Sequence, residues 1–373
     1  MDHQRQSASS ASELPSRVRA LISQTGPEMD GDEGFDRLAL AVFAFQFDGV
    51  PIYRRLCERR GVSPGSVKHW SQVPALPVSA FKEHAVSSLA ENDRGRVFHS
   101  SGTTGHIPSR HFHNAASLSL YEASLLPWFE RHFPGSSAGG ATFLFLTPPP
   151  KLVPHSSLVH MFETVRLKFG GAESPYAGQL EADGSWSLDY NQIGSALRDA
   201  ISGNRPVALL GTAFSFVHWL DSLAVNKNRL RLPAGSRIME TGGYKGRSRV
   251  VAKADLRRLL TKYLAVPESH IVTEYGMSEL SSQAYDGVAG QARQSAGIFR
   301  FPPWVRTQII SPETGAVAAA GETGLLRVFD PANMYSVMAL QTEDLAASRG
   351  DGFELLGRAE SAGPRGCSLL AAT

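Results

Sequence analysis

The sequence predicts an α/β fold, with a largely parallel sheet covered by helices and a smaller β-rich subdomain toward the C-terminus. From about residue 98 onward, short runs rich in β-branched and aromatic residues alternate with stretches of helical periodicity. That alternation is typical of parallel strands joined by helices. After residue 300 the pattern changes to strands and turns. A length of 373 residues suits one large α/β body or two fused lobes.

The first 30 residues are expected to form a polar tail and a first helix. Residues 1–12 are rich in Ser, Ala and Gln, which predicts a mobile tail. Two apolar-periodic stretches follow, around 33–47 and 50–60, and both predict amphipathic helices.

The strands of the predicted parallel sheet are short apolar runs, and each is followed by a longer helical pattern. We expect strands at 141–147, 207–211, 237–241 and 270–275, and helices near 115–132, 156–169, 213–225 and 253–264. Pro148–Pro150 breaks the chain directly after the first strand, at the carboxyl edge where open α/β sheets bind ligands. In the β-rich part, Ser311–Gly315 predicts a hairpin turn and Leu325–Phe329 a strand.

The composition argues against several classes of protein. The 37 Lys and Arg residues and 35 Asp and Glu residues are spread along the chain, so there is no electrostatic footprint for nucleic acid or an anionic membrane. The two cysteines, Cys57 and Cys367, make neither a disulfide framework nor a metal cluster. The N-terminus lacks a leader-like apolar core, and no run approaches ~18 apolar residues. We therefore expect a cytoplasmic protein without a membrane span.

The most specific local signal is a loop of glycines and hydroxyl residues. It consists of Ser100, Ser101, Gly102, Thr103, Thr104 and Gly105. Backbone N–H groups of a glycine-rich turn bind anions, and the hydroxyls add donors, so the loop predicts a phosphate site. It is not a Walker-type loop, because no Gly-Lys-Ser/Thr follows. The alternative is an ordinary surface loop.

A second segment, Glu274–Glu279, begins at the end of a predicted strand and would lie at the carboxyl edge of the sheet. Glu279 can hold Mg²⁺, since a magnesium ion on phosphate oxygens takes one or two protein carboxylates. Tyr275 offers a flat face for a purine. The alternative is a helix N-terminus, with Ser278 as its cap and Glu279 in its first turn.

Three weaker signals have related chemistry. Gly242 and Gly243 follow another strand and permit close approach of a planar ring, although a simple strand-to-loop turn explains them as well. Near the end, Asp344 and Arg358 can grip a ribose and its phosphate, and an Asp in a turn is alternatively a local cap. His155, after the proline-rich turn, can reach a substrate carboxylate or be structural.

The order of these segments resembles the adenylate-forming superfamily of acyl-CoA synthetases, peptide-synthetase adenylation domains and luciferases, over about residues 98–360. Five segments in order are similar to the acyl-protein synthetase family, which supplies fatty acid to bacterial luminescence reductases. They are Pro77–Lys82, Phe98–Gly105, Thr241–Arg247, Tyr275–Leu280 with Gln283, and Arg365–Ser368. The resemblance implies an adenylate-forming large domain over 31–357 and a C-terminal tail over 358–373.

The resemblance also implies residue roles. The ligands of ATP or AMP would be Ser100, Ser101, Gly102, Thr103, Thr104, Gly105, Gly242, Gly243, Tyr244, Tyr275, Gly276, Ser278, Asp344 and Arg358. Glu279 would hold Mg²⁺, and Glu279 and Arg358 would act in catalysis. His155, Gly211 and Ala213 are the candidates for the acyl side.

Two departures from the superfamily pattern stand out. The lysine that usually follows the phosphate loop is absent, and His106–Arg110 stands in its place, where Arg110 can substitute. The chain also stops soon after Arg358, so the swinging C-terminal domain of the superfamily is expected to be missing or vestigial.

The related synthetases hold the acyl group as a thioester on a cysteine near the C-terminus, and Cys367 occupies the matching place. A thiolate is the attacking species, and Arg365 can lower the pKa of Cys367. The nine residues from Arg358 to Cys367 can span up to ~30 Å, enough to carry an acyl group to a partner. The alternative is an incidental thiol in the tail.

These observations predict an acyl-protein synthetase that converts a carboxylic acid, expected to be a fatty acid, to acyl-AMP with ATP and Mg²⁺. Cys367 would then take the acyl group and pass it to an acyl-reductase or another acyl-accepting protein. One alternative is an adenylating ligase for an aryl or other small acid, with CoA, a carrier or an amine as acceptor. Another is a non-catalytic subunit that binds a nucleotide or an acid.

Overall fold

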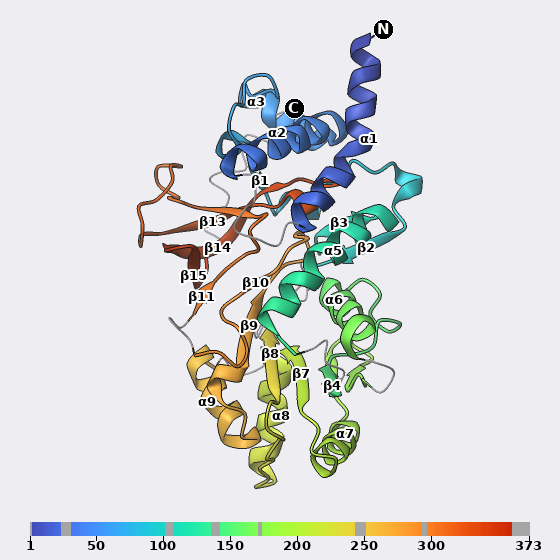
Figure 1. Ribbon diagram of the computed structural model, residues 1–373, viewed down its shortest axis with the longest axis vertical. Coiled ribbons are helices and arrows are strands. Elements are labelled where there is room, and N and C mark those ends of the chain that lie inside the picture. The colour runs from blue at the N-terminus through green and yellow to red at the C-terminus, as the bar shows by residue number, and fades with distance from the viewer. Residues whose placement is uncertain are drawn as a thin grey trace.

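The computed structural model describes residues 2–23, 31–100, 107–135, 142–170, 174–242, 251–292 and 297–359, with residues 2–12 and 31–32 described for their backbone alone. Two sheets organise the chain (Figure 1). None of the described helices is long and apolar enough to cross a membrane.

The central sheet has five strands in the order β10-β9-β8-β7-β4. Its strands are β4 (Thr142–Leu146), β7 (Val207–Thr212), β8 (Arg237–Thr241), β9 (Ile271–Tyr275) and β10 (Ala284–Tyr285). The pairings from β4 to β9 are all parallel, and β10 alone runs antiparallel to β9. The structure therefore confirms the predicted parallel sheet and all four of its predicted strands.

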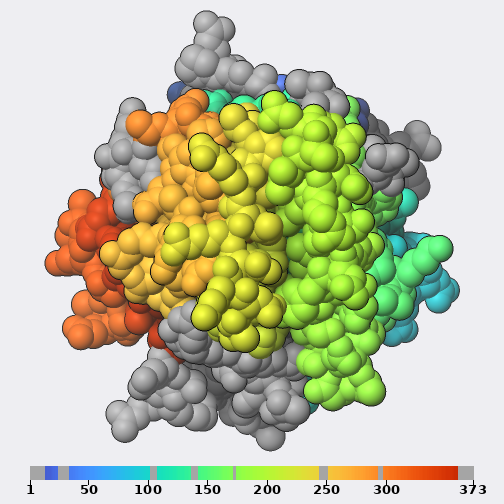
Figure 2. Space-filling model, turned by 90° about the horizontal axis from the view of Figure 1, so that it is seen from below, coloured from blue at the N-terminus to red at the C-terminus, as the bar shows by residue number. Residues whose placement is uncertain are grey.

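Side chains of each strand alternate between two apolar layers, as the two-residue period of a strand requires. Phe145, Leu210 and Met239 face the larger core, which includes α5 (Ala115–His132) and α6 (Ser157–Val165). Leu209 and Ile238 face the smaller core. That core includes α7 (Tyr190–Ser202), α8 (Ala213–Val225) and α9 (Lys253–Leu264). Figure 2 looks at the end of the molecule where segments from green to orange, the region of α7 to α9, lie side by side.

The second sheet contains the predicted β-rich part. Its strands are β11 (Ile298–Phe299), β15 (Gly352–Arg358), β14 (Ala339–Arg349), β13 (Thr323–Phe329) and β12 (Arg306–Ile310), all antiparallel in that order. β1 (Leu76–Pro77) pairs parallel with β14, so the sheet also includes a short strand from far upstream. The predicted turn at Ser311–Gly315 follows β12, and the N–H of Ser311 donates to the carbonyl of Ala316.

The α-helices described before the first hairpin are α1 (Asp2–Ser23), α2 (Gly31–Gly49), α3 (Pro51–Arg59) and α4 (Ala80–Glu83). α2 and α3 confirm the two predicted amphipathic helices. Residues 2–12, for which we expect a mobile tail, have helical backbone and continue α1. Leu14 and Val18 anchor the second half of this helix in the core, and Arg19 donates to Ser119 of α5 at 2.7 Å. A packed half-helix favours extension of its remaining turns.

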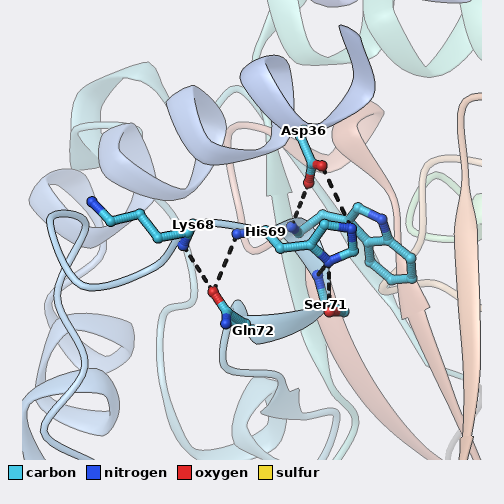
Figure 3. Close-up of polar contacts among 6 residues, drawn as sticks. Asp36, Lys68, His69, Ser71 and Gln72 are labelled. Atoms are coloured by element: carbon cyan, nitrogen blue, oxygen red, sulfur yellow. Dashed lines mark hydrogen bonds and ion pairs between the residues drawn. The ribbon is translucent and has the colours of Figure 1, made fainter. Parts of the chain in front are cut away.

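A polar cluster ties α2 to the following segment (Figure 3). Asp36 of α2 accepts the backbone N–H of Trp70 at 2.6 Å and lies 3.5 Å from Nε2 of His69. The side chain of Gln72 accepts the N–H of His69, which closes the short 3₁₀ turn at Trp70–Gln72. The Trp70 ring then meets Phe329 of β13 edge to face at 4.9 Å. This cluster joins the N-terminal helices to the second sheet.

The remaining elements are two short hairpins and several single turns. The hairpins are β2 (Arg96–His99) with β3 (Arg110–His113), and β5 (Gly178–Leu180) with β6 (Trp186–Leu188). The segment predicted as a helix at 156–169 is α6 continued by a π-helical stretch at Arg166–Gly170. β2 and β3 flank the glycine- and hydroxyl-rich loop, so this hairpin positions the candidate site.

Candidate active site

Three site residues predicted from distant parts of the sequence meet at the junction of the two sheets. Tyr275 is the last residue of β9, and its hydroxyl donates to Asp344 Oδ2 at 2.7 Å. Asp344 of β14 pairs across the sheet with Arg358 of β15. The Nε of Arg358 donates to Asp344 Oδ1 at 3.2 Å. Three strands from two sheets therefore hold one carboxylate between a phenol and a guanidinium.

The surroundings of this trio are apolar on the inner side and open on the outer side. The Tyr275 ring packs edge-on against Phe299 and Phe353, and burial raises the pKa of its hydroxyl well above 10. The Asp344 side chain is 10% exposed, whereas that of Arg358 is 68% exposed. The guanidinium thus stays accessible to an anionic ligand while it neutralises the partly buried carboxylate.

Ser278 and Glu279 lie in a turn just beyond Tyr275, and both are buried. The Ser278 hydroxyl donates to Glu279 Oε2 at 2.9 Å, and Asn333 Nδ2 donates to the Glu279 carbonyl at 2.8 Å. No helix begins here within residues 276–283, so the alternative of a capped helix N-terminus does not apply. Turn backbone and buried partners fix the orientation of this carboxylate.

Ser100 and Ser109, which flank the glycine- and hydroxyl-rich loop in the sequence, contact each other beside that turn. The N–H of Ser109 donates to the hydroxyl of Ser100 at 2.9 Å, and the N–H of Ser100 donates to the Ser109 carbonyl at 3.3 Å. The Ser109 hydroxyl then lies 3.3 Å from that of Ser278. The predicted ligands Ser101, Gly102, Thr103, Thr104 and Gly105 lie outside the described residues. Ser100 and Ser109, on either side of this segment in the sequence, thus lie against each other, and Ser109 lies beside Ser278.

A buried histidine supports the same junction. His111 of β3 is 2% exposed, and its Nδ1 donates to the carbonyl of Ser278 at 2.8 Å, since a carbonyl can only accept. Burial lowers the pKa of His111 to about 4, so the ring is neutral at pH 7. His111 is a site residue that sequence reasoning missed, because nothing in the local pattern distinguishes it from other histidines.

A buried carboxylate next to Tyr275 was also missed. Glu274 projects from β9 to the face opposite Tyr275, and the Thr241 hydroxyl of β8 donates to its Oε2. A Cβ at Gly276 would stand 2.4 Å from Glu274 Oε1, so a side chain there would require the Glu274 carboxylate to move. Burial raises the pKa of Glu274 from 4.5 to about 7. A charged residue inside an otherwise apolar strand was the available signal.

The remaining predicted residues have separate surroundings. Gly242 directly follows β8 with a φ of +71°, a conformation that favours glycine. Gly243 and Tyr244 lie outside the described residues. Gly211 of β7 packs against Leu146 and Phe216, and Ala213 begins α8 in the smaller apolar core.

His155 lies elsewhere, beside the loop hairpin. Its ring stacks on that of His99, the last residue of β2, with centroids 4.8 Å apart. The acyl-side candidates Gly211 and Ala213 are therefore in a different environment from His155.

Comparison with known proteins agrees with this architecture. The sequence profile described as "Acyl-protein synthetase, LuxE" matches residues 159–372, more than half of the chain. A long-chain-fatty-acid–luciferin-component ligase of Vibrio harveyi is 22% identical over 345 residues, covering 89% of this chain and 86% of the relative.

Solved structures show the same fold at low sequence identity. An open conformation of 2-hydroxyisobutyryl-CoA ligase, in complex with an acyl adenylate and CoA, superposes with a TM-score of 0.64 at 13% identity. The match covers 90% of this chain and 76% of the ligase. The thioesterification state of that ligase gives a TM-score of 0.65 at 14% identity, over 90% of this chain and 70% of the other.

Proposed function

The chain belongs to the acyl-protein synthetase family and is an acid-activating ligase, and from this premise we propose that it joins a fatty acid to AMP and then to a protein thiol. The observation that carries the proposal is the meeting of Tyr275, Asp344 and Arg358 beside the Ser278–Glu279 turn and the ends of the phosphate loop. The Tyr275 and Asp344 side chains, which suit a nucleoside, thus lie at the same edge of the sheet as the Ser278–Glu279 turn, which suits phosphates.

ATP is the proposed nucleotide. The Asp344 carboxylate accepts one hydrogen bond from Tyr275 and one from Arg358. Each of its oxygens keeps a second lone pair, which can accept a ribose hydroxyl. Arg358 sits on the solvent side of Asp344, where its exposed guanidinium suits a phosphate. Gly242, Gly243, Tyr244 and Tyr275 would surround the adenine, and residues Ser100 to Gly105 would hold the pyrophosphate end.

Magnesium fits Glu279. Among the described residues there is no group of three or more His, Cys, Asp or Glu side chains that could hold a metal ion. A magnesium ion that keeps waters and phosphate oxygens needs only one or two carboxylates. Glu279 offers one carboxylate, held in place by Ser278. Bound there, the ion would neutralise charge on the phosphate oxygens.

The first step is the attack of a substrate carboxylate oxygen on the α-phosphorus of ATP. The new oxygen–phosphorus bond replaces the bond to pyrophosphate, which leaves. Arg358 and the donors around Ser278 would stabilise the charge that grows on the phosphate oxygens, and a preorganised donor of this kind contributes a factor of about 10²–10³ in rate. His111 is neutral and fixes the Ser278 carbonyl, so its role is to position the turn.

In the second step the thiolate of Cys367 attacks the acyl carbon, AMP leaves, and a thioester forms. Cys367 and the rest of the 358–373 tail beyond Ala359 lie outside the described residues. Support comes from the sequence resemblance around Arg365–Ser368. A partner with acyl-reductase or other acyl-accepting activity would then take the acyl group. The name of the Vibrio harveyi relative, a long-chain-fatty-acid ligase, favours fatty acid as substrate.

The test is ATP–pyrophosphate exchange with a panel of fatty and aryl acids, followed by intact mass after incubation with the best acid and ATP. We expect exchange with fatty acids and a hydroxylamine-labile acyl adduct. The adduct should disappear in Cys367→Ala while exchange persists. Cys57→Ala is the matched control and should keep the adduct, because burial raises the pKa of the Cys57 thiol to about 11 and keeps it protonated.

The other outcomes identify the alternatives. Exchange with aryl or short acids alone, without an adduct, would show a small-acid ligase with a different acceptor. Nucleotide binding without exchange for any acid would contradict the proposed reaction.

A further inference from the structure

A buried connection in the second sheet contacts the turn that carries Glu279. Residues 330–338 join β13 to β14 and include a short 3₁₀ turn at Pro331–Asn333. Every residue of this connection is buried except Tyr335, which is half-buried, although connections between strands ordinarily run over the surface. Polar groups that are buried in this way need hydrogen-bond partners inside the protein.

The side chain of Asn333 extends from this connection to the Glu279 turn. Its Nδ2 donates to the carbonyl of Glu279 at 2.8 Å and to the carbonyl of Val337 at 3.0 Å. Its Oδ1 accepts the hydroxyl of Ser281 at 2.7 Å. Both donors and the acceptor of one amide are therefore used, and two of the three bonds hold the turn.

Asp330, the first residue of the connection, holds the same turn. Its Oδ2 accepts the N–H of Ser281 at 3.1 Å, and its Oδ1 accepts the hydroxyl of Ser282 at 2.9 Å. The Ser282 hydroxyl also lies 2.7 Å from that of Ser124 in α5. The connection thus contacts the turn at Glu279, Ser281 and Ser282.

Gln46 of α2 fixes the connection without contacting the turn. Its Nε2 donates to the carbonyls of Asn333 and Met334, both at 3.1 Å, and its Oε1 accepts the N–H of Met338 at 3.0 Å. Gln46 and Asn333 therefore each provide three buried side-chain hydrogen bonds to the same segment. Only the bonds of Asn333 reach the Glu279 turn.

The connection also leads directly into the strand that carries Asp344. β14 begins at Ala339, immediately after the connection, and Asp344 lies within that strand. The Glu279 turn and Asp344 are thus fixed relative to each other through this segment, in addition to the bond from Tyr275 to Asp344.

The geometry points to Asn333 as a positioning residue that holds the Glu279 turn in place relative to Asp344. Without its amide, the Glu279 carbonyl and the Ser281 hydroxyl lose a buried partner, and the turn has to shift to replace it. Glu279 offers a magnesium ion one carboxylate, so a shift of its backbone weakens the metal contact. This consequence for the metal rests on the proposed function, whereas the restraint on the turn does not.

Hydrogen exchange of the whole chain, without ligand, tests the restraint. In the wild type, amides in peptides covering residues 276–283 should exchange as slowly as those of β9, because the turn is held by buried partners. Asn333→Leu replaces the amide by an apolar group of similar shape and should speed exchange of these peptides about tenfold or more. Gln46→Met is the matched control. It also removes three buried hydrogen bonds from the connection, and it should leave exchange of 276–283 unchanged.

Binding of Mn²⁺ to the complex of the protein with ATP, followed by electron paramagnetic resonance, tests the consequence for the metal. Asn333→Leu should raise the Mn²⁺ dissociation constant about 10- to 100-fold, the usual effect of removing a group that supports a metal ligand. Gln46→Met should keep the value of the wild type. Unfolding temperatures of both variants show that a lowered stability alone does not change metal binding.

An unchanged Mn²⁺ affinity in Asn333→Leu would overturn the proposal, as would equal shifts in the two variants, which would reflect a general loosening of the connection. Fast exchange of 276–283 in the wild type would overturn it as well, and that measurement needs no variant. Failure of the proposed function appears separately, as absence of acid-dependent pyrophosphate exchange in a protein whose turn is still protected by Asn333.

Discussion

Replacing Glu274 by Gln should change how the stability of the protein depends on pH. Glu274 is buried beside β8, its pKa is about 7, and its one described hydrogen bond comes from the Thr241 hydroxyl. Burial raises the pKa, the Thr241 bond lowers it, and repulsion from Glu240 raises it again. Glutamine has nearly the same shape, can accept the same hydrogen bond and cannot ionise.

The sign of the effect follows from proton binding. Between about pH 4.5 and 7 the folded state keeps the Glu274 proton while the unfolded state loses it, so unfolding releases a proton and stability falls as the pH rises. The two pKa values differ by about 2.5, which corresponds to roughly 3 kcal/mol of stability lost across that window. Above pH 7 the loss is complete and the contribution is constant.

Urea denaturation of wild type and Glu274→Gln at several pH values measures this term. The free energy of unfolding of the variant minus that of the wild type should be larger at pH 8 than at pH 5, by up to roughly 3 kcal/mol. Asp330, whose pKa burial raises to about 6, contributes a similar slope to both proteins and cancels in the difference. Parallel stability profiles from pH 5 to 8 would refute the reasoning, because they would show that Glu274 ionises normally in the folded protein.

Three further substitutions test the site and its support. Asp344→Asn should raise the dissociation constant for ATP about tenfold, since the side chain that accepts hydrogen bonds from Tyr275 and Arg358 loses its charge. Equilibrium nucleotide binding measures this constant, and an unchanged value would count against a role of Asp344 in binding ribose. Glu279→Gln should lower the maximal exchange rate about 100-fold at saturating magnesium while the fold persists, and a normal rate would remove Glu279 from the metal site. Arg257→Leu should lower the free energy of unfolding measured in urea by about 3–5 kcal/mol, because it removes the cation of an ion pair with the fully buried side chain of Asp286. A loss below about 1 kcal/mol would contradict the importance of that pair.

Much of the fold was predictable from local patterns. The strands β7, β8 and β9 were found because each is a short apolar run between turn residues, and the helices α5, α8 and α9 because their periodicity extends over several turns. The first turns of α1 were missed, since a Ser- and Ala-rich stretch resembles a tail until the packed half of the helix is known. β1 was missed as well, because two residues cannot show a period and their partner is in β14.

The sequence indicated which residues to consider for the candidate site, but not how their side chains are oriented. Tyr275, Ser278, Glu279, Asp344 and Arg358 were identified in advance from motif order, and the structure brings them to one edge. The orientation of Glu279 in a turn instead of a helix was decided by contacts with distant residues, such as the amide that supports its carbonyl.

By itself, then, the sequence determined the α/β class, the parallel strands and the residues that resemble an acyl-protein synthetase site. Only the tertiary structure decided that His99 stacks on His155, which lies 56 positions away, and that Glu274 ionises near neutral pH. The physical reason is that element formation depends on periodicities carried by neighbouring residues. Charge state and partnership depend instead on burial and on distance through space, and both arise when the chain folds.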